Sequence, residues 1–130
     1  MLPARHRMRR SEEFSRAVRR GRRAGSAHLA VHLLLASDTD PAAQAARGPA
    51  RVGVVVSKAV GTAVTRTRVK RRLRAVASAR LHRLPDGALA VLRATPASAE
   101  ATSAALGLDL DRSLDRVLTP SRRSGVRISP

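Results

Sequence analysis

The fold is decided by residues 51–93, which read RVGVVVSKAVGTAVTRTRVKRRLRAVASARLHRLPDGALAVLR. The stretch opens at residues 51–58 with a β-branched run that is typical of a buried strand. Gly61 ends this run, and because no helix breaker follows before Pro85, a helix is expected from residue 62 or 63 to residue 84. A second apolar strand is expected at residues 88–93. The order of strand, helix and strand predicts a βαβ unit.

The predicted helix has one narrow apolar face, and the rest of its surface is strongly basic. Its apolar face consists of residues at helical spacing, Val69, Leu73 and Val76. A ridge of cations four residues apart lies beside this face and consists of Arg66, Lys70 and Arg74. Like charges at this spacing repel by a few tenths of a kcal/mol per pair, roughly, and a polyanion along the ridge would relieve the repulsion. A merely solvated helix would normally mix Glu with Arg, so the pattern favours a nucleic-acid ligand.

Two more elements are expected before this unit. Residues 11–20 predict a short helix with Ser11 as its N-cap. Residues 27–36 predict a strand in which alternate side chains point to opposite faces, so that His28 and His32 share one face. A strand and a helix placed before a βαβ unit are compatible with a small α+β domain.

The carboxyl-terminal part predicts one more helix. Ser98 is its expected N-cap and Pro120 ends it. Its apolar stripe is expected at Ala101, Ala105, Leu108, Leu114, Val117 and Leu118. Residues 1–118 would thus form a single RNA-binding domain, residues 37–50 a long loop, and residues 119–130 a basic disordered tail.

The composition favours a small cytoplasmic protein that binds a polyanion. The chain has 130 residues, and 26 Lys and Arg against 9 Asp and Glu give a net charge of +17. The absence of Cys excludes a disulfide framework and a thiolate metal site, and favours a reducing compartment. The basic start followed by an apolar run could suggest an export signal. However, His28 and His32 interrupt the run, which is also too short to cross a bilayer.

Residues 54–74, VVVSKAVGTAVTRTRVKRRLR, resemble the signature of the bacterial ribonuclease P protein component. In that family a strand ending in Ser-Lys leads through Gly to a helix that carries Arg-x-Arg, then Lys-Arg and a further Arg. The similarity continues at residues 9–14 and 93–98, and it covers about residues 5–118. Its specificity comes from the agreement of spacing, strand context and length.

The resemblance implies a fold of the α/β class, an α+β sandwich with a small, mainly antiparallel sheet and about three helices. It also implies a left-handed βαβ crossover, which departs from the usual hand. The implied function is that of the protein subunit of ribonuclease P, which binds the catalytic RNA and the 5′ leader of precursor tRNA to assist endonucleolytic 5′ maturation. The RNA would cleave through Mg²⁺, whereas the protein would be monomeric, contact no membrane, hold no metal alone and supply no catalytic residue.

The resemblance also assigns two groups of residues to RNA. The basic helix would face the catalytic RNA through Arg66, Thr67, Arg68, Lys70, Arg71, Arg72 and Arg74. A cleft between the first helix and the sheet would hold the leader and is expected to be lined by Phe14, Val18, His32 and Lys58. The family usually has Asn at the positions that Thr62 and Thr67 occupy in this sequence. It usually has aromatic residues at the positions of Val18, Leu29 and His32. Electrostatics would therefore carry more of the leader affinity here.

Two other function classes remain open. A general structured-RNA or ribosome-associated binding protein would use the same charge, but it would lack the spacing from Ser-Lys to the arginines. An autonomous nuclease would need its own catalytic groups, and the sequence has no P-loop, no HExxH and no carboxylate pair at catalytic spacing. The aspartates of the last helix, Asp109, Asp111 and Asp115, are expected to stay solvated and to repel RNA.

Overall fold

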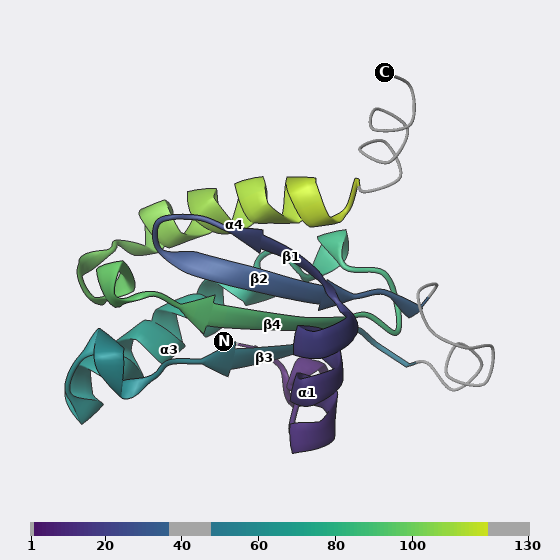
Figure 1. The fold of residues 1–130 in the computed structure, drawn as a ribbon, viewed down its shortest axis with the longest axis horizontal. Coiled ribbons are helices and arrows are strands. Elements are labelled where there is room, and N and C mark those ends of the chain that lie inside the picture. Colours follow the sequence, from purple (N-terminus) through teal and green to yellow (C-terminus); the bar gives the residue numbers. More distant parts are fainter. Residues whose placement is uncertain (1, 37–47, 120–130) are drawn as a thin grey trace.

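The computed structural model describes residues 2–36 and 48–119, which form three layers around one sheet (Figure 1). The sheet has the strand order β1-β2-β4-β3, and its strands are β1 (Arg22–Gly25), β2 (Leu29–Leu34), β3 (Arg51–Val55) and β4 (Leu89–Ala94). The α-helices are α1 (Ser11–Arg20), α3 (Ala63–Ser78) and α4 (Ser103–Val117). Short 3₁₀ helices lie between them: η1 (Ala4–His6), η3 (Lys58–Val60), η4 (Leu81–Arg83) and η5 (Pro96–Glu100). The expected α+β sandwich is confirmed.

The β3-α3-β4 unit has the left-handed crossover that the resemblance implied. β3 and β4 are parallel neighbours, whereas the β1–β2 and β2–β4 pairs are antiparallel. In Figure 1 both β3 and β4 point to the left, β4 lies above β3, and α3 passes behind the sheet. With the strands turned to point upward, β4 lies to the right of β3 and the helix lies behind them. This arrangement is left-handed, the rare hand for such a connection.

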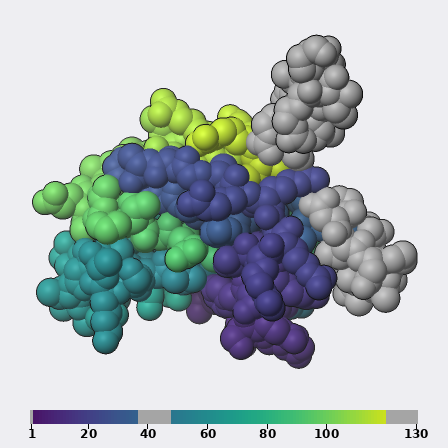
Figure 2. All heavy atoms as spheres, in the orientation of Figure 1, coloured from purple at the N-terminus to yellow at the C-terminus, as the bar shows by residue number. Residues whose placement is uncertain are grey.

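The two faces of the sheet are covered by different helices, and α1, in purple, lies on the face that is turned toward the viewer in Figure 2. On one face, Leu29, Val31 and Leu33 of β2 are fully buried beneath α3 and α4. On the other face, Leu34 and Val91 pack with the α1 side and belong to a separate, smaller cluster. Alternation of side chains along β2 therefore supplies both cores, as the sequence predicted.

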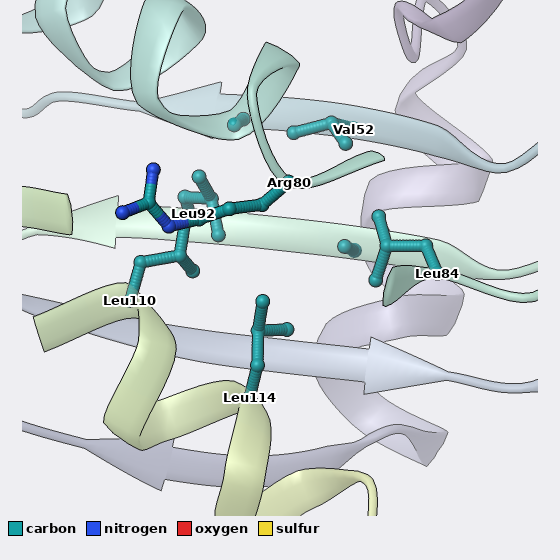
Figure 3. A pocket seen from close by; sticks show the side chains of 8 residues that line it. Val52, Arg80, Leu84, Leu92, Leu110 and Leu114 are labelled. Carbon is teal, nitrogen blue, oxygen red and sulfur yellow. The ribbon is translucent and has the colours of Figure 1, made fainter. Parts of the chain in front are cut away.

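The larger core contains a small gap. Figure 3 shows this gap between the sheet, α3 and α4, with Leu92, Leu110 and Leu114 around it and the Arg80 side chain at its edge. Its volume is about 10 Å³, which is room for a single water at most. The gap therefore belongs to the packing and offers no ligand site.

α3 is shorter than the sequence predicted. The α-helix ends at Ser78, and residues 81–83 form the 3₁₀ helix η4 instead of continuing to residue 84. Side chains three residues apart eclipse in a 3₁₀ helix, and Leu81 and Leu84 both pack against the larger core. Tertiary packing therefore ends the α-helix here, and the sequence gives no signal for this end, because residues 79–84 contain no Gly or Pro.

The last helix begins later than predicted, and its buried stripe differs. Thr102 is the N-cap and its hydroxyl accepts a hydrogen bond from the Ala105 N–H at 3.0 Å. Ser98 lies instead in η5, where its hydroxyl donates to the Thr95 carbonyl. Leu108 is 51% exposed, whereas the buried stripe includes Leu106, Leu110, Leu114 and Val117. The prediction of Ser98 as N-cap and of Leu108 in the stripe was therefore wrong.

The amino-terminal helix is confirmed with a different cap. α1 spans the predicted residues, but Ser11 is its first helical residue, and Arg10 occupies the N-cap position without a side-chain cap bond. The strand that follows it, β1, was not predicted, because the sequence RRAG has no alternation of apolar and polar residues. Residues 37–47 and 120–130, which contain most of the predicted loop and tail, lie outside the described residues.

Gly21 joins α1 to β1 and has no room for a side chain. A Cβ at this position would lie 2.3 Å from the Ala17 carbonyl oxygen and 2.9 Å from the Leu33 carbonyl carbon, both of which belong to the backbone. We therefore expect Gly21→Ala to lower the free energy of unfolding by about 1–3 kcal/mol, measured by urea denaturation. Gly25→Ala is the matched control, because its Cβ would meet only the end of the Arg23 side chain at 3.9 Å. Equal losses in the two variants would contradict this account.

Candidate nucleic-acid interface

Local sequence fixes where α3 begins. Gly61 has φ = 155°, a backbone conformation that side chains disfavour, and it separates η3 from the helix. Thr62 is the N-cap, and its hydroxyl accepts a hydrogen bond from the Thr65 N–H at 3.3 Å. Val69 and Leu73 are fully buried, as predicted, so the opposite side of α3 faces outward.

Two hollows lie along the outward side of α3. The first is lined by Ala63, Val64, Thr67, Arg68 and Arg71. The second is lined by Arg7, Thr67, Lys70, Arg71, Arg74 and Ala75. Because Thr67 and Arg71 line both, the two hollows form one continuous region, which we call the α3 basic surface. The structure thus brings together Thr67, Arg68, Lys70, Arg71 and Arg74 of the predicted helix site.

Arg66 and Arg72 point to other parts of the chain. The Nε of Arg66 donates to the Gly61 carbonyl at 3.2 Å, and Nη1 of Arg72 donates to the Ala101 carbonyl at 2.8 Å. Arg72 therefore links α3 to the end of η5, and Arg66 links the first turn of α3 to the residue before its N-cap. Each of these two side chains has one donor engaged within the protein. Their contacts with RNA stay predictions.

The cations of α3 have no acidic partner in the described parts of the chain. Among the described residues, no carboxylate lies within 4.0 Å of any Lys or Arg of α3. A helix surface with several cations and no counter-charge attracts polyanions and releases their counterions on binding. The α3 basic surface is therefore suited electrostatically to a nucleic-acid backbone.

All three aspartates of α4 make contacts within the protein, and Asp109 is buried, which corrects the sequence prediction for that residue. The side chains of Asp111 and Asp115 are 41% and 68% exposed, so these two stay partly solvated while each pairs with an arginine. Asp111 accepts from Arg80 at 2.7 Å, and Asp115 accepts from Arg83 at 2.6 Å. Hydrogen bonds from Arg80 lower the pKa of Asp111 despite partial desolvation, and the charges of Arg80 and Arg83 add to this effect. These carboxylates therefore neutralise arginines near the end of α3.

His28 does not share a face with His32, contrary to prediction. It precedes β2, and its Nδ1 lies 2.5 Å from the Asp109 carboxylate on α4, to which its backbone N–H also donates at 3.1 Å. Burial opposes ionisation of Asp109, but the hydrogen bonds from His28 and Ser26 outweigh it and lower the pKa of the carboxyl group. This contact joins the start of β2 to α4.

The predicted leader residues Phe14, Val18 and His32 lie on the α1 side of the sheet. The Phe14 ring lies directly against Gly53, where an added Cβ would be 2.4 Å from the ring. Val18 is 36% exposed, so it is accessible to a ligand. Lys58 is exposed but lies in η3, beyond the carboxyl end of β3. The structure thus places three of the four predicted leader residues on one face, with Lys58 at the end of a strand.

α1 itself is held to the sheet by an ion pair that the sequence did not reveal. Glu13 is buried, and its carboxylate accepts from the Arg51 guanidinium at the start of β3. A paired buried charge is tolerated, whereas either partner alone would be strongly destabilising. The pair therefore helps to set the position of α1 over the sheet.

His32 is surrounded by positive charge. It is only 4% exposed, and neither ring nitrogen has a hydrogen-bond partner. Burial lowers its pKa, and the nearby Arg93 and Arg23 lower it further, so the ring is neutral at pH 7. Strand pairing brings both arginines to the ring. On β1, Arg23 pairs directly with His32. On β4, Val91 pairs with His32, and Arg93 lies two residues further along that strand, on the same face.

Sequence reasoning missed three cations that the fold brings to these surfaces: Arg7, Arg23 and Arg93. The parity of β4 could have revealed Arg93, since residues two apart in a strand share a face. Arg7 and Arg23 gave no such signal, because their places depend on long-range strand pairing.

The described residues offer no metal site and no membrane span. In residues 2–36 and 48–119, no group of three His, Asp or Glu side chains could hold a metal ion. Over the same ranges, none of the helices combines the length and apolar character needed to cross a membrane.

The fold and surface define a small basic α+β protein with an exposed cationic helix on a rigid sheet. A family model described as Ribonuclease P matches residues 2–118. The chain belongs to this family, as the sequence resemblance indicated. It is 54% identical over 119 residues to the ribonuclease P protein component of Streptomyces griseus, covering 91% of this chain and 96% of that protein. It is 58% identical over 114 residues to that of Beutenbergia cavernae, covering 88% and 89%.

Solved structures of the family share the fold. The Staphylococcus aureus RNase P protein superimposes with a TM-score of 0.67 at 20% identity, over 85% of this chain and 93% of that one. The Thermotoga maritima RNase P protein gives a TM-score of 0.65 at 18% identity, over 85% and 96%. The chain is thus a protein subunit of ribonuclease P that takes part in tRNA processing, and it is a component of an RNA-based ribonuclease.

The buried His32 predicts a pH dependence of stability. Because its pKa is lowered in the folded state, the unfolded chain takes up this proton more readily once the pH falls below about 6.5. The stability contributed by the neutral ring is therefore present above that pH and is lost as the pH falls through the lower folded pKa.

We expect His32→Leu to show a smaller loss of stability than the wild type between pH 7 and pH 5, measured by urea denaturation at each pH. At pH 7 the variant should be at least as stable, because an unpaired buried polar group costs about 1–3 kcal/mol. The exposed His82 provides the control, and His82→Gln should keep the wild-type pH dependence. An unchanged dependence in His32→Leu would refute the assignment.

Proposed function

We propose that the α3 basic surface binds the catalytic RNA of ribonuclease P, while the α1 side of the sheet holds the single-stranded 5′ leader of precursor tRNA. The observation that carries the proposal is the set of α3 cations without a carboxylate partner among the described residues. Like charges on one helix repel one another, and RNA phosphates remove this repulsion.

The leader part of the proposal is supported by the composition of the α1 side. Val18 offers an accessible apolar contact, and two exposed cations, Arg23 and Arg93, lie on the same face. The His32 ring beneath these arginines is only 4% exposed, so it offers no stacking surface to a base, contrary to its predicted place in the cleft lining. Single-stranded nucleic acids bind proteins through cations that follow the phosphates, and stacking on aromatic side chains adds to this where such side chains are exposed. Since the His32 ring is buried and Val18 stands where the family usually has an aromatic residue, we propose that the cations supply most of the leader affinity.

We propose further that the RNA partner performs the cleavage, with Mg²⁺ held by the RNA, and that one copy of the protein acts in the cytoplasm. The chain's own carboxylates on α4 and at Glu13 are occupied by ion pairs. The α3 basic surface would repel a free divalent cation, which prefers carboxylate and carbonyl oxygens. The residues present therefore fit a role in binding and orienting RNA.

Reconstitution tests the first part of the proposal. We expect Arg71→Ala to weaken binding to a bacterial ribonuclease P RNA by about tenfold, because an arginine–phosphate contact contributes about 1.5–3 kcal/mol. The rate of 5′ maturation of precursor tRNA at low Mg²⁺ should fall with it. Arg112→Ala is the matched control, because Arg112 is exposed on α4 and carries the same charge.

Equal effects of the two variants would show that total charge rather than its placement governs binding. Equal affinity of the wild-type protein for an unrelated structured RNA of the same length would favour the alternative, a general RNA-binding protein.

A separate pair of variants tests the leader part. Val18→Glu and Arg16→Gln each lower the net charge by one, and both residues are exposed on α1. Only Val18→Glu places a carboxylate on the α1 side of the sheet, where the leader is proposed to bind. It should therefore weaken binding of precursor tRNA to the holoenzyme by about tenfold, which corresponds to the loss of roughly one base contact.

Val18→Glu should leave binding of mature tRNA unchanged, because mature tRNA has no leader. The measurement is the dissociation constant of each tRNA from the reconstituted holoenzyme. A loss of affinity for mature tRNA as large as that for precursor tRNA would contradict the placement of the leader.

A further inference from the structure

The amino-terminal segment runs along the open edge of the sheet, beside α3. β3 is an edge strand of the sheet. The Met8 N–H lies along its open edge and donates a hydrogen bond to the carbonyl of Val52 in β3 at 2.9 Å. Arg7 forms a parallel bridge with Val52. Met8 belongs to the cluster on the α1 side, so alternation directs its neighbour Arg7 to the side of α3.

Arg7 completes a hollow whose other cations come from α3. The lining includes Arg7, Lys70, Arg71 and Arg74, from two segments that are more than sixty residues apart in the chain. The hollow has a volume of about 420 Å³, against about 10 Å³ for the gap in the larger core. It is open and large enough for a ligand, and four cations surround it without a carboxylate within 4.0 Å among the described residues.

The Arg7 side chain is held in place with its binding edge free. Its Nε donates to the Leu2 carbonyl at 3.1 Å, and Leu2 is buried in the larger core. Within the described part of the chain, neither Nη atom of Arg7 makes a hydrogen bond. A guanidinium with two free Nη groups presents parallel N–H donors that match two oxygens of a phosphate.

We propose that this hollow is a phosphate site, in which Arg7 binds a backbone phosphate of the catalytic RNA opposite Lys70, Arg71 and Arg74. The inference rests on the proposed function and adds a residue that lies outside the helix. A phosphate in this place would be held from two sides, by the amino-terminal segment and by α3. It would therefore define the angle at which the RNA backbone crosses the helix.

The test compares Arg7→Gln with Arg5→Gln in the full-length protein. Both variants lose one charge at nearby positions, and Arg5 is exposed in η1, with its Nε directed to His6. The measurement is the affinity for the catalytic RNA as a function of salt. Arg7→Gln should weaken binding by about tenfold and reduce the slope of log K against log salt by about one.

A conservative variant and two further binding measurements complete the test. Arg7→Lys keeps the charge and should recover the slope but only part of the affinity. Titration of the wild-type protein with inorganic phosphate should shift the amide signals of residues 70–75 and Arg7 in an NMR spectrum, which requires no variant to fold. The same salt series with precursor tRNA alone should show no difference between the two Gln variants.

Equal slopes for Arg7→Gln and Arg5→Gln, with normal wild-type binding, would overturn the Arg7 site and leave the proposed function intact. An Arg7→Gln defect seen equally with precursor tRNA would place the wrong RNA in the hollow and would also overturn it. Failure of the wild-type protein to bind the catalytic RNA would overturn both.

Discussion

The structure depends on the apolar contact between α3 and the sheet. Val69, Leu73 and Val76 are the residues that anchor the helix, and the first two are fully buried. Burial of each such side chain contributes about 1.5–3 kcal/mol, whereas each pair of like charges on the helix costs only a few tenths, roughly. The apolar contact therefore outweighs the repulsion, and a helix that would be unstable alone can display its cations on a rigid support.

Elements with a clear hydrophobic period could be predicted from the sequence. The β-branched run of β3, the stripe of α3 and the alternation in β2 each follow from local spacing, and the structure confirms them. β1 could not be predicted in this way, because RRAG forms a strand through its pairing with β2. The end of α3 and the start of α4 were misplaced because tertiary packing, rather than a breaker, determines them.

The candidate site was predictable in its charge but not in its detailed composition. The Arg and Lys cluster on α3 is visible in the sequence, since no acidic residue interrupts it. Sequence spacing could not show that Arg66 and Arg72 donate to backbone carbonyls. Nor could it show that Arg7, from the amino-terminal segment, lines the same hollow as the cations of α3. It also could not show that His28 turns toward Asp109, because a residue just outside a strand does not follow the strand's alternation.

The pairing of Asp111 and Asp115 with Arg80 and Arg83 gives the molecule an uneven electric field. The acidic groups of α4 offset cations near the carboxyl end of α3, whereas the cations from Arg68 to Arg74 have no carboxylate partner in residues 2–36 and 48–119. A dipole of this kind turns a protein during its diffusional approach to a polyanion, before any contact forms. In the proposed arrangement, the acidic residues of this strongly basic chain would therefore turn the part of α3 from Arg68 to Arg74 toward the RNA first.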